Sequence, residues 1–134
     1  MDIMLDAGKF SLSLNPKIYF SDIEYPENTI LHIQLYSNGF SAKTTMDIDF
    51  KKFKIFISEI NNLYNTLKGS TAITEPYGSQ KITFSADKTG HIDVMGSLTS
   101  ITDGYSHSLE FENSFDQTYL KDFITELNKL SKWP

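Results

Sequence analysis

The 134-residue sequence contains neither cysteine nor arginine. Without cysteine the chain can form no disulfide, has no thiolate nucleophile and offers no sulfur ligand to zinc. All twelve basic residues are lysine, so the side chain that binds phosphate and guanine in a bidentate manner is missing. The seventeen acidic residues bring the net charge to −5, which disfavours nucleic-acid binding. We therefore expect a partner other than DNA or RNA.

Long apolar runs are also missing. No stretch approaches the roughly 18 apolar residues that cross a bilayer, and Asp2 and Asp6 stand where a signal peptide has a basic region. We expect no membrane segment, no secretion and a cytoplasmic location, which the lack of cysteine also fits. A chain of this length can bury one core, so a single domain is predicted over residues 1–134.

Alternating apolar and polar residues predict strands in both halves of the chain. Asn38-Gly39 and Asp103-Gly104 are strong signals for hairpin turns, because both residue pairs tolerate positive φ. On the last strand, Tyr105, His107, Leu109 and Phe111 are expected to share the apolar face. The expected strands are 10–14, 29–37, 40–48, 70–74, 81–86, 91–102 and 105–112.

Two segments, about 49–68 and about 116–132, change to apolar spacings of three and four and predict amphipathic helices. Asp47 or Asp49 can cap the first helix, and Gly69 suits the left-handed residue that ends it. The second begins in the stretch NSFDQTYLKDF. There Ser114 and Gln117 match the S-x-x-Q capping box, and Asp116 adds favourable negative charge at the N-terminus.

These elements predict an α+β fold with one antiparallel, twisted sheet of about six to seven strands. Both amphipathic helices are expected on one face of that sheet, which leaves the other face free of helices. The two halves follow the same order, a hairpin and then a helix, although they share few identical residues.

The best candidates for catalysis or ligand binding are His91, Asp93 and His107. His91 and Asp93 are two residues apart on a predicted strand and would share a face, whereas Ser106 and His107 are consecutive and would point to opposite faces. An enzyme or small-molecule-binding domain would require these three side chains to converge on a closed cavity. No other catalytic motif, metal site or cofactor site is predicted.

Four segments occur in a characteristic order between Gly39 and Leu130: NGFSAKT, FKIFISEINNLYNTLKGS, ITFSADKTGHIDVMGSL and FDQTYLKDFITEL. In this order they resemble the WapI-type immunity protein family, small bacterial domains linked to polymorphic toxin systems. The resemblance implies a non-enzymatic protein that neutralises a cognate toxin by direct binding. A basic toxin domain would be attracted to an acidic surface.

Binding is expected through acidic and aromatic residues in loops and on the sheet face without helices. A structural or assembly subunit is a further alternative, since such proteins also lack catalytic motifs. The predicted partner-binding residues are Asp22, Glu24, Tyr25, Glu27, Tyr36, Glu110 and Glu112.

Overall fold

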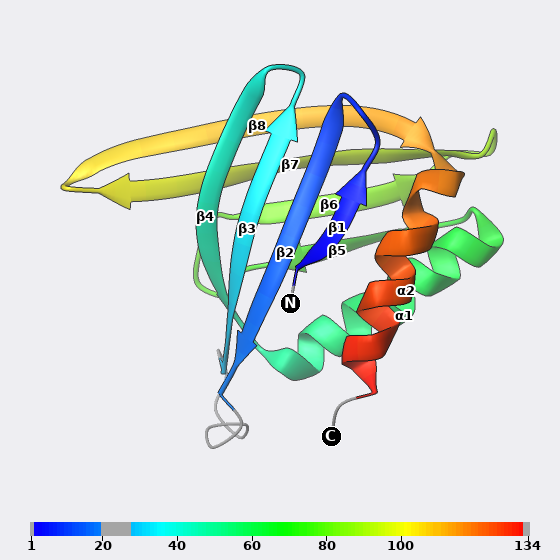
Figure 1. The fold of residues 1–134 in the computed structure, drawn as a ribbon, viewed down its shortest axis with the longest axis horizontal. Helices are drawn as coiled ribbons and strands as arrows, with labels where there is room; N and C mark the ends of the chain where they lie inside the picture. The colour runs from blue at the N-terminus through cyan, green and yellow to red at the C-terminus, as the bar shows by residue number, and fades with distance from the viewer. Residues whose placement is uncertain (1, 20–27, 133–134) are drawn as a thin grey trace.

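The computed structural model describes residues 2–19 and 28–132, which form two four-stranded antiparallel sheets and two α-helices (Figure 1). Sheet A has the strand order β1-β2-β3-β4 and sheet B the order β5-β6-β7-β8. Sheet A consists of β1 (Ile3–Asp6), β2 (Phe10–Ile18), β3 (Thr29–Ser37) and β4 (Phe40–Ile48). Sheet B consists of β5 (Ser70–Thr74), β6 (Lys81–Ala86), β7 (His91–Thr102) and β8 (Tyr105–Asp116). The helices are α1 (Phe50–Thr66) and α2 (Leu120–Ser131), the latter preceded by the 3-10 turn η2 (Gln117–Tyr119).

The α+β class with two helices is confirmed, but the prediction of a single sheet is wrong. Consecutive strands pair with each other within each half, whereas the 17-residue helix α1 separates β4 from β5. The chain therefore starts a second sheet after α1 instead of extending the first. Strand β1 of sheet A was not predicted, although Ile3 and Leu5 are fully buried and alternate with exposed residues.

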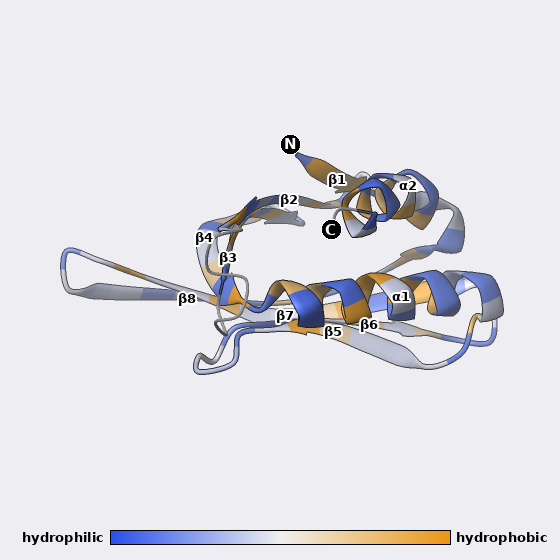
Figure 2. Cartoon of the chain, turned by 90° about the horizontal axis from the view of Figure 1, so that it is seen from below, coloured by the Kyte–Doolittle hydropathy of each residue, from blue (hydrophilic) through white to orange (hydrophobic). Residues whose placement is uncertain are grey.

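The strands of the two sheets run crosswise in Figure 1, and Figure 2 shows α1 lying along sheet B, with α2 beside β1 of sheet A. Helix α1 packs on β5 and β6, and α2 packs on β1 and α1. The ring of Phe10 in β2 stacks on Phe111 and Phe115 in β8, with centroid distances of 6.0 and 6.1 Å. Phe84 of sheet B lies against Phe123 of α2. Each sheet thus has one buried inner face, and each has an outer face of its own.

The helix ends follow local chemistry only in part. Asp49 caps α1 as predicted and accepts a hydrogen bond from the Lys51 amide at 2.9 Å. Leu67, with φ of 54°, takes the left-handed position expected of Gly69. Helix α1 therefore ends at Thr66, two residues before the predicted end, with the left-handed residue inside the apolar stripe.

The predicted capping box at Ser114 is wrong, because β8 continues to Asp116 and Ser114 pairs with Asp93 in the sheet. Asp116 is the capping residue and accepts the Thr118 amide at 2.9 Å. The side chain of Gln117 donates to the backbone oxygen of Tyr64 instead of returning to a cap amide. Strand pairing with the long β7 therefore overrides the local capping motif.

Candidate partner-binding surface

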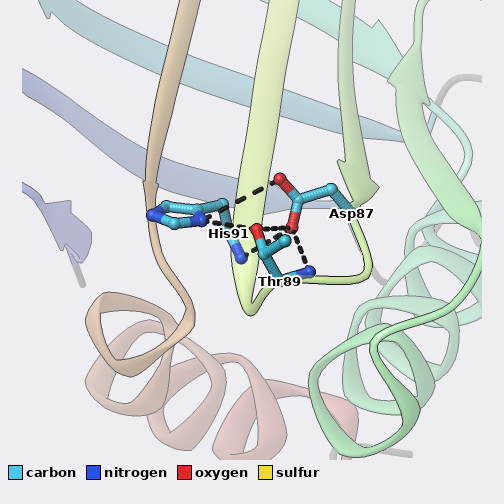
Figure 3. A network of polar contacts seen from close by, with 3 residues as sticks. All are labelled: Asp87, Thr89 and His91. Atoms are coloured by element: carbon cyan, nitrogen blue, oxygen red, sulfur yellow. Dashed lines mark hydrogen bonds and ion pairs between the residues drawn. The ribbon is translucent and has the colours of Figure 1, made fainter.

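A polar network at the turn between β6 and β7 accounts for one of the candidate histidines (Figure 3). The carboxylate of Asp87 accepts hydrogen bonds from the Thr89 amide and hydroxyl, both at 2.8 Å, and from the His91 amide at 3.0 Å. The ring Nδ1 of His91 lies 2.9 Å from the Thr89 hydroxyl and 3.9 Å from Asp87 Oδ2. These contacts close a turn, so His91 has a structural role here.

The hydrogen bonds in this region also lower the pKa of two carboxyl groups. The His91 amide, followed by the Thr89 hydroxyl and amide, holds the pKa of Asp87 below 3.8. The pKa of Asp116, which lies opposite His91 in the sheet, is lowered chiefly by the amide of Thr118. Both carboxylates are therefore ionised at neutral pH.

The three candidate catalytic residues do not converge. Asp93 is exposed on β7 two residues from His91, and His91 pairs with Asp116 at one end of β8. On β8, His107 lies nine residues from Asp116, the partner of His91, which is about 30 Å at the rise of an extended strand. Within residues 2–19 and 28–132, no group of three His, Asp or Glu side chains could hold a metal ion. The closed cavity predicted for a ligand-binding domain is therefore not formed by these residues.

The segment from His91 to Asp116, which forms β7 and β8, contains five acidic residues and no lysine. The rest of the chain has twelve acidic residues and twelve lysines. The whole net charge of −5 therefore belongs to this two-stranded segment, which we call the ribbon.

The predicted binding residues Glu110 and Glu112 lie on the outer face of the ribbon, because they are exposed and flank the buried Phe111. Their cross-strand partners are Ser97 and Met95, and Met95 is also exposed. A shallow groove of about 600 Å³ runs over this face and is lined by Lys81, Met95, Glu110 and Glu112 among others. Carboxylates and an exposed apolar side chain thus share one accessible surface.

The end of the ribbon extends beyond the body of the molecule (Figures 1 and 2). Strand β6 begins at Lys81, opposite Ser97, so later residues of β7 pair with β8 alone. We call residues 100–107 the arm. At its base, the amide of Thr99 donates to Gln80 Oε1 at 3.1 Å, and the carbonyl of Thr99 accepts from the Thr44 hydroxyl at 2.7 Å.

The tip of the arm is the predicted Asp103-Gly104 turn, with φ of 53° and 81° and Thr102 paired with Tyr105. The prediction that Tyr105 and His107 lie on an apolar face is wrong, because both are exposed. That face contacts the core only from Leu109 onward, because the first residues of β8 extend beyond the rest of the molecule. Ile101 and Tyr105 are left 76% and 72% exposed.

The remaining predicted binding residues lie elsewhere. Tyr36 is exposed on the outer face of sheet A, beside a groove that also includes Met4, Gln34 and Lys43. It does not share a face with Glu110 and Glu112. The other four, Asp22, Glu24, Tyr25 and Glu27, lie outside the described residues.

A larger cavity of about 740 Å³ connects the outer face of sheet A with the base of the arm. Its lining includes His32, Gln34 and Lys43 of sheet A together with Thr99 and Ile101 of the ribbon. Sequence reasoning missed both Ile101 and this groove. The sequence feature that could have indicated them is the length of the predicted strands around Asp103-Gly104, which are longer than their neighbour β6.

The chain was compared with curated proteins and with solved structures. No curated protein matches the sequence. Among solved structures, the plant transcriptional regulator PBF-2 gives a TM-score of 0.49 at 9% identity, covering 98% of this chain and 80% of that one. WHY3 from Arabidopsis thaliana gives a TM-score of 0.48 at 12% identity, with 98% and 86% covered. Likeness at this level carries no functional argument.

No helix in the described ranges 2–19 and 28–132 is long and apolar enough to cross a membrane. The resemblance seen in the sequence is confirmed by a family model that matches residues 4–134, nearly the whole chain. The protein is a member of the immunity protein WapI-like family.

Proposed function

We propose that this protein neutralises a cognate toxin by binding it directly through the outer face of the ribbon. Family membership supports an immunity role, which implies a protein partner. The observation that carries the choice of surface is that the ribbon holds the entire net charge of the chain.

The carboxylates of this face are available to a partner. Among the described residues, Asp93, Glu110 and Glu112 form no ion pair. A concentration of unneutralised charge attracts an oppositely charged partner and increases its association rate. The partner is therefore a toxin domain with a basic surface, and neutralisation requires no catalysis or cofactor. We expect it to take place in the cytoplasm of the producing cell.

The first test is co-expression with the toxin encoded beside the gene for this protein. Wild-type protein is expected to restore growth and to form a complex with the purified, catalytically inactive toxin domain. If no neighbouring toxin is neutralised or bound, the proposed function is refuted.

The second test addresses the surface. Glu110→Lys with Glu112→Lys should reduce the association rate about tenfold and weaken its dependence on salt. Asp47→Lys with Glu126→Lys changes the net charge by the same amount on exposed or half-exposed positions outside the ribbon. Equal association rates for the two double variants would show that overall charge, and not the ribbon face, drives binding.

A further inference from the structure

The arm has no role in packing the fold. Its residues, 100–107, are exposed except for the half-buried Ser100. A two-stranded hairpin is only marginally stable in water when it stands alone. Here it is held at the base through both backbone groups of Thr99 and at the tip by a tight two-residue turn. The arm is thus preorganised without being covered.

The side chains at the tip are unusual for an element surrounded by water. Ile101 and Tyr105 lie close to the turn and are among the most exposed large apolar side chains of the described residues. Asp103 is the only acidic residue in the arm, and the arm contains no lysine. Tyr supplies a large contact area at low entropic cost, and aromatic anchors recur at the centres of interfaces.

The dimensions of the arm determine the shape of a matching partner surface. Three residues of each strand, at about 3.3 Å per residue, project about 10 Å past the base, and the two-residue turn lies beyond them. The arm is only two strands wide, so it can enter a cleft on a partner, whereas a flat partner surface would contact only the tip of the arm.

We propose that the arm inserts into a concave, lysine- or arginine-lined cleft of the toxin, with Ile101 and Tyr105 as its apolar anchors. This inference rests on the proposed function and adds the mode of binding. The acidic ribbon behind the tip supplies charge complementary to the cleft. The groove at the arm's base, which Ile101 and Lys43 both line, leaves space for the rim of the cleft.

The inference is tested by the affinity of arm variants for the purified inactive toxin domain. Ile101→Ala and Tyr105→Ala should each raise the dissociation constant about tenfold or more, mainly through faster dissociation. The matched controls are Ile55→Ala on α1 and Tyr77→Ala in the turn before β6, whose side chains are 57% and 86% exposed. Both controls should bind within twofold of wild type. Since all four residues are exposed, the variants are expected to fold, and their melting temperatures check this.

A competition experiment tests the chemistry of the cleft. Heparin, a polyanion that occupies lysine- and arginine-rich grooves, should displace wild-type protein from the toxin domain. If wild-type protein binds the toxin domain and the arm variants bind it equally tightly, the inference is overturned and the proposed function still stands. Complexes that resist heparin would also overturn it. Arm-dependent dimers of this chain by itself, seen by analytical ultracentrifugation, would assign the arm to self-association instead. Failure of wild-type protein to bind overturns the proposed function first and the inference with it.

Discussion

Replacing Gln80 with methionine tests how the two sheets and the arm are connected. Gln80 precedes β6 and is only 5% exposed. Its Nε2 donates to the Thr45 carbonyl of sheet A at 2.8 Å, and its Oε1 accepts the Thr99 amide of sheet B at 3.1 Å. One side chain therefore joins β4 to the base of the arm.

The expected loss follows from these two hydrogen bonds. Methionine has nearly the same length and volume, so Gln80→Met leaves no large cavity and removes the polar contacts alone. Each hydrogen bond contributes about 1 kcal/mol net. Thr45 is exposed and Thr99 is half-buried, so water can replace part of what each backbone group loses. We therefore expect a decrease of about 1 to 2 kcal/mol in the free energy of unfolding.

Urea unfolding followed by far-ultraviolet circular dichroism measures this change. Gln34→Met, on the exposed face of sheet A, is the matched control and should change stability by less than about 0.5 kcal/mol. Hydrogen exchange at the Thr99 amide should also become faster in Gln80→Met. A loss below about 0.5 kcal/mol, or unchanged exchange at Thr99, would refute the argument that Gln80 anchors the arm.

Four further outcomes are expected. Because the pKa of Asp87 is below 3.8 in the folded state, its contribution to stability is complete above pH 3.8 and is lost as the pH falls through the lowered value. Urea midpoints of Asp87→Asn between pH 2 and 6 should thus show a flatter acid dependence than wild type, and parallel profiles would contradict this. Asp116→Ala should lower the melting temperature more than Ser114→Ala, since Asp116 is the residue that caps η2; the reverse order would restore the capping box. Phe123→Ala, at a fully buried position, should cost about 3 to 5 kcal/mol in urea unfolding, and a cost under about 1 kcal/mol would place α2 outside the core. Gly96→Ala should cost about 1 to 3 kcal/mol, because its Cβ would clash with the Lys81 carbonyl oxygen, and a neutral effect would show that the strands can separate there.

The order of local elements followed directly from the sequence. Side-chain periodicity is a local property, and it placed both helices and most strands. The two hairpin turns were also predictable, because Asn38-Gly39 and Asp103-Gly104 supply the positive φ that such turns require. The family resemblance depended on the same order of segments, and the family match confirms it.

The structure places the predicted binding residues on different surfaces, and their role in binding stays a prediction. Glu110 and Glu112 lie together on an accessible face, whereas Tyr36 lies on the other sheet. His91 and His107 looked comparable in sequence, yet one closes a turn and the other belongs to the arm. Because His91 is on β7 and His107 on β8, the distance between them depends on how these strands pair, which local patterns do not specify.

The sequence alone determined that the chain has two helices, paired strands with tight turns and an excess of acidic residues. Only the tertiary structure decided that the strands divide into two sheets, because that depends on α1, which follows β4 and packs on β5 and β6 of the second sheet. It also decided that β7 and β8 extend past β6, so that an alternating strand ends in an exposed arm instead of a buried face. The physical reason is that periodicity specifies which side chains share a face, whereas burial depends on which other element covers that face.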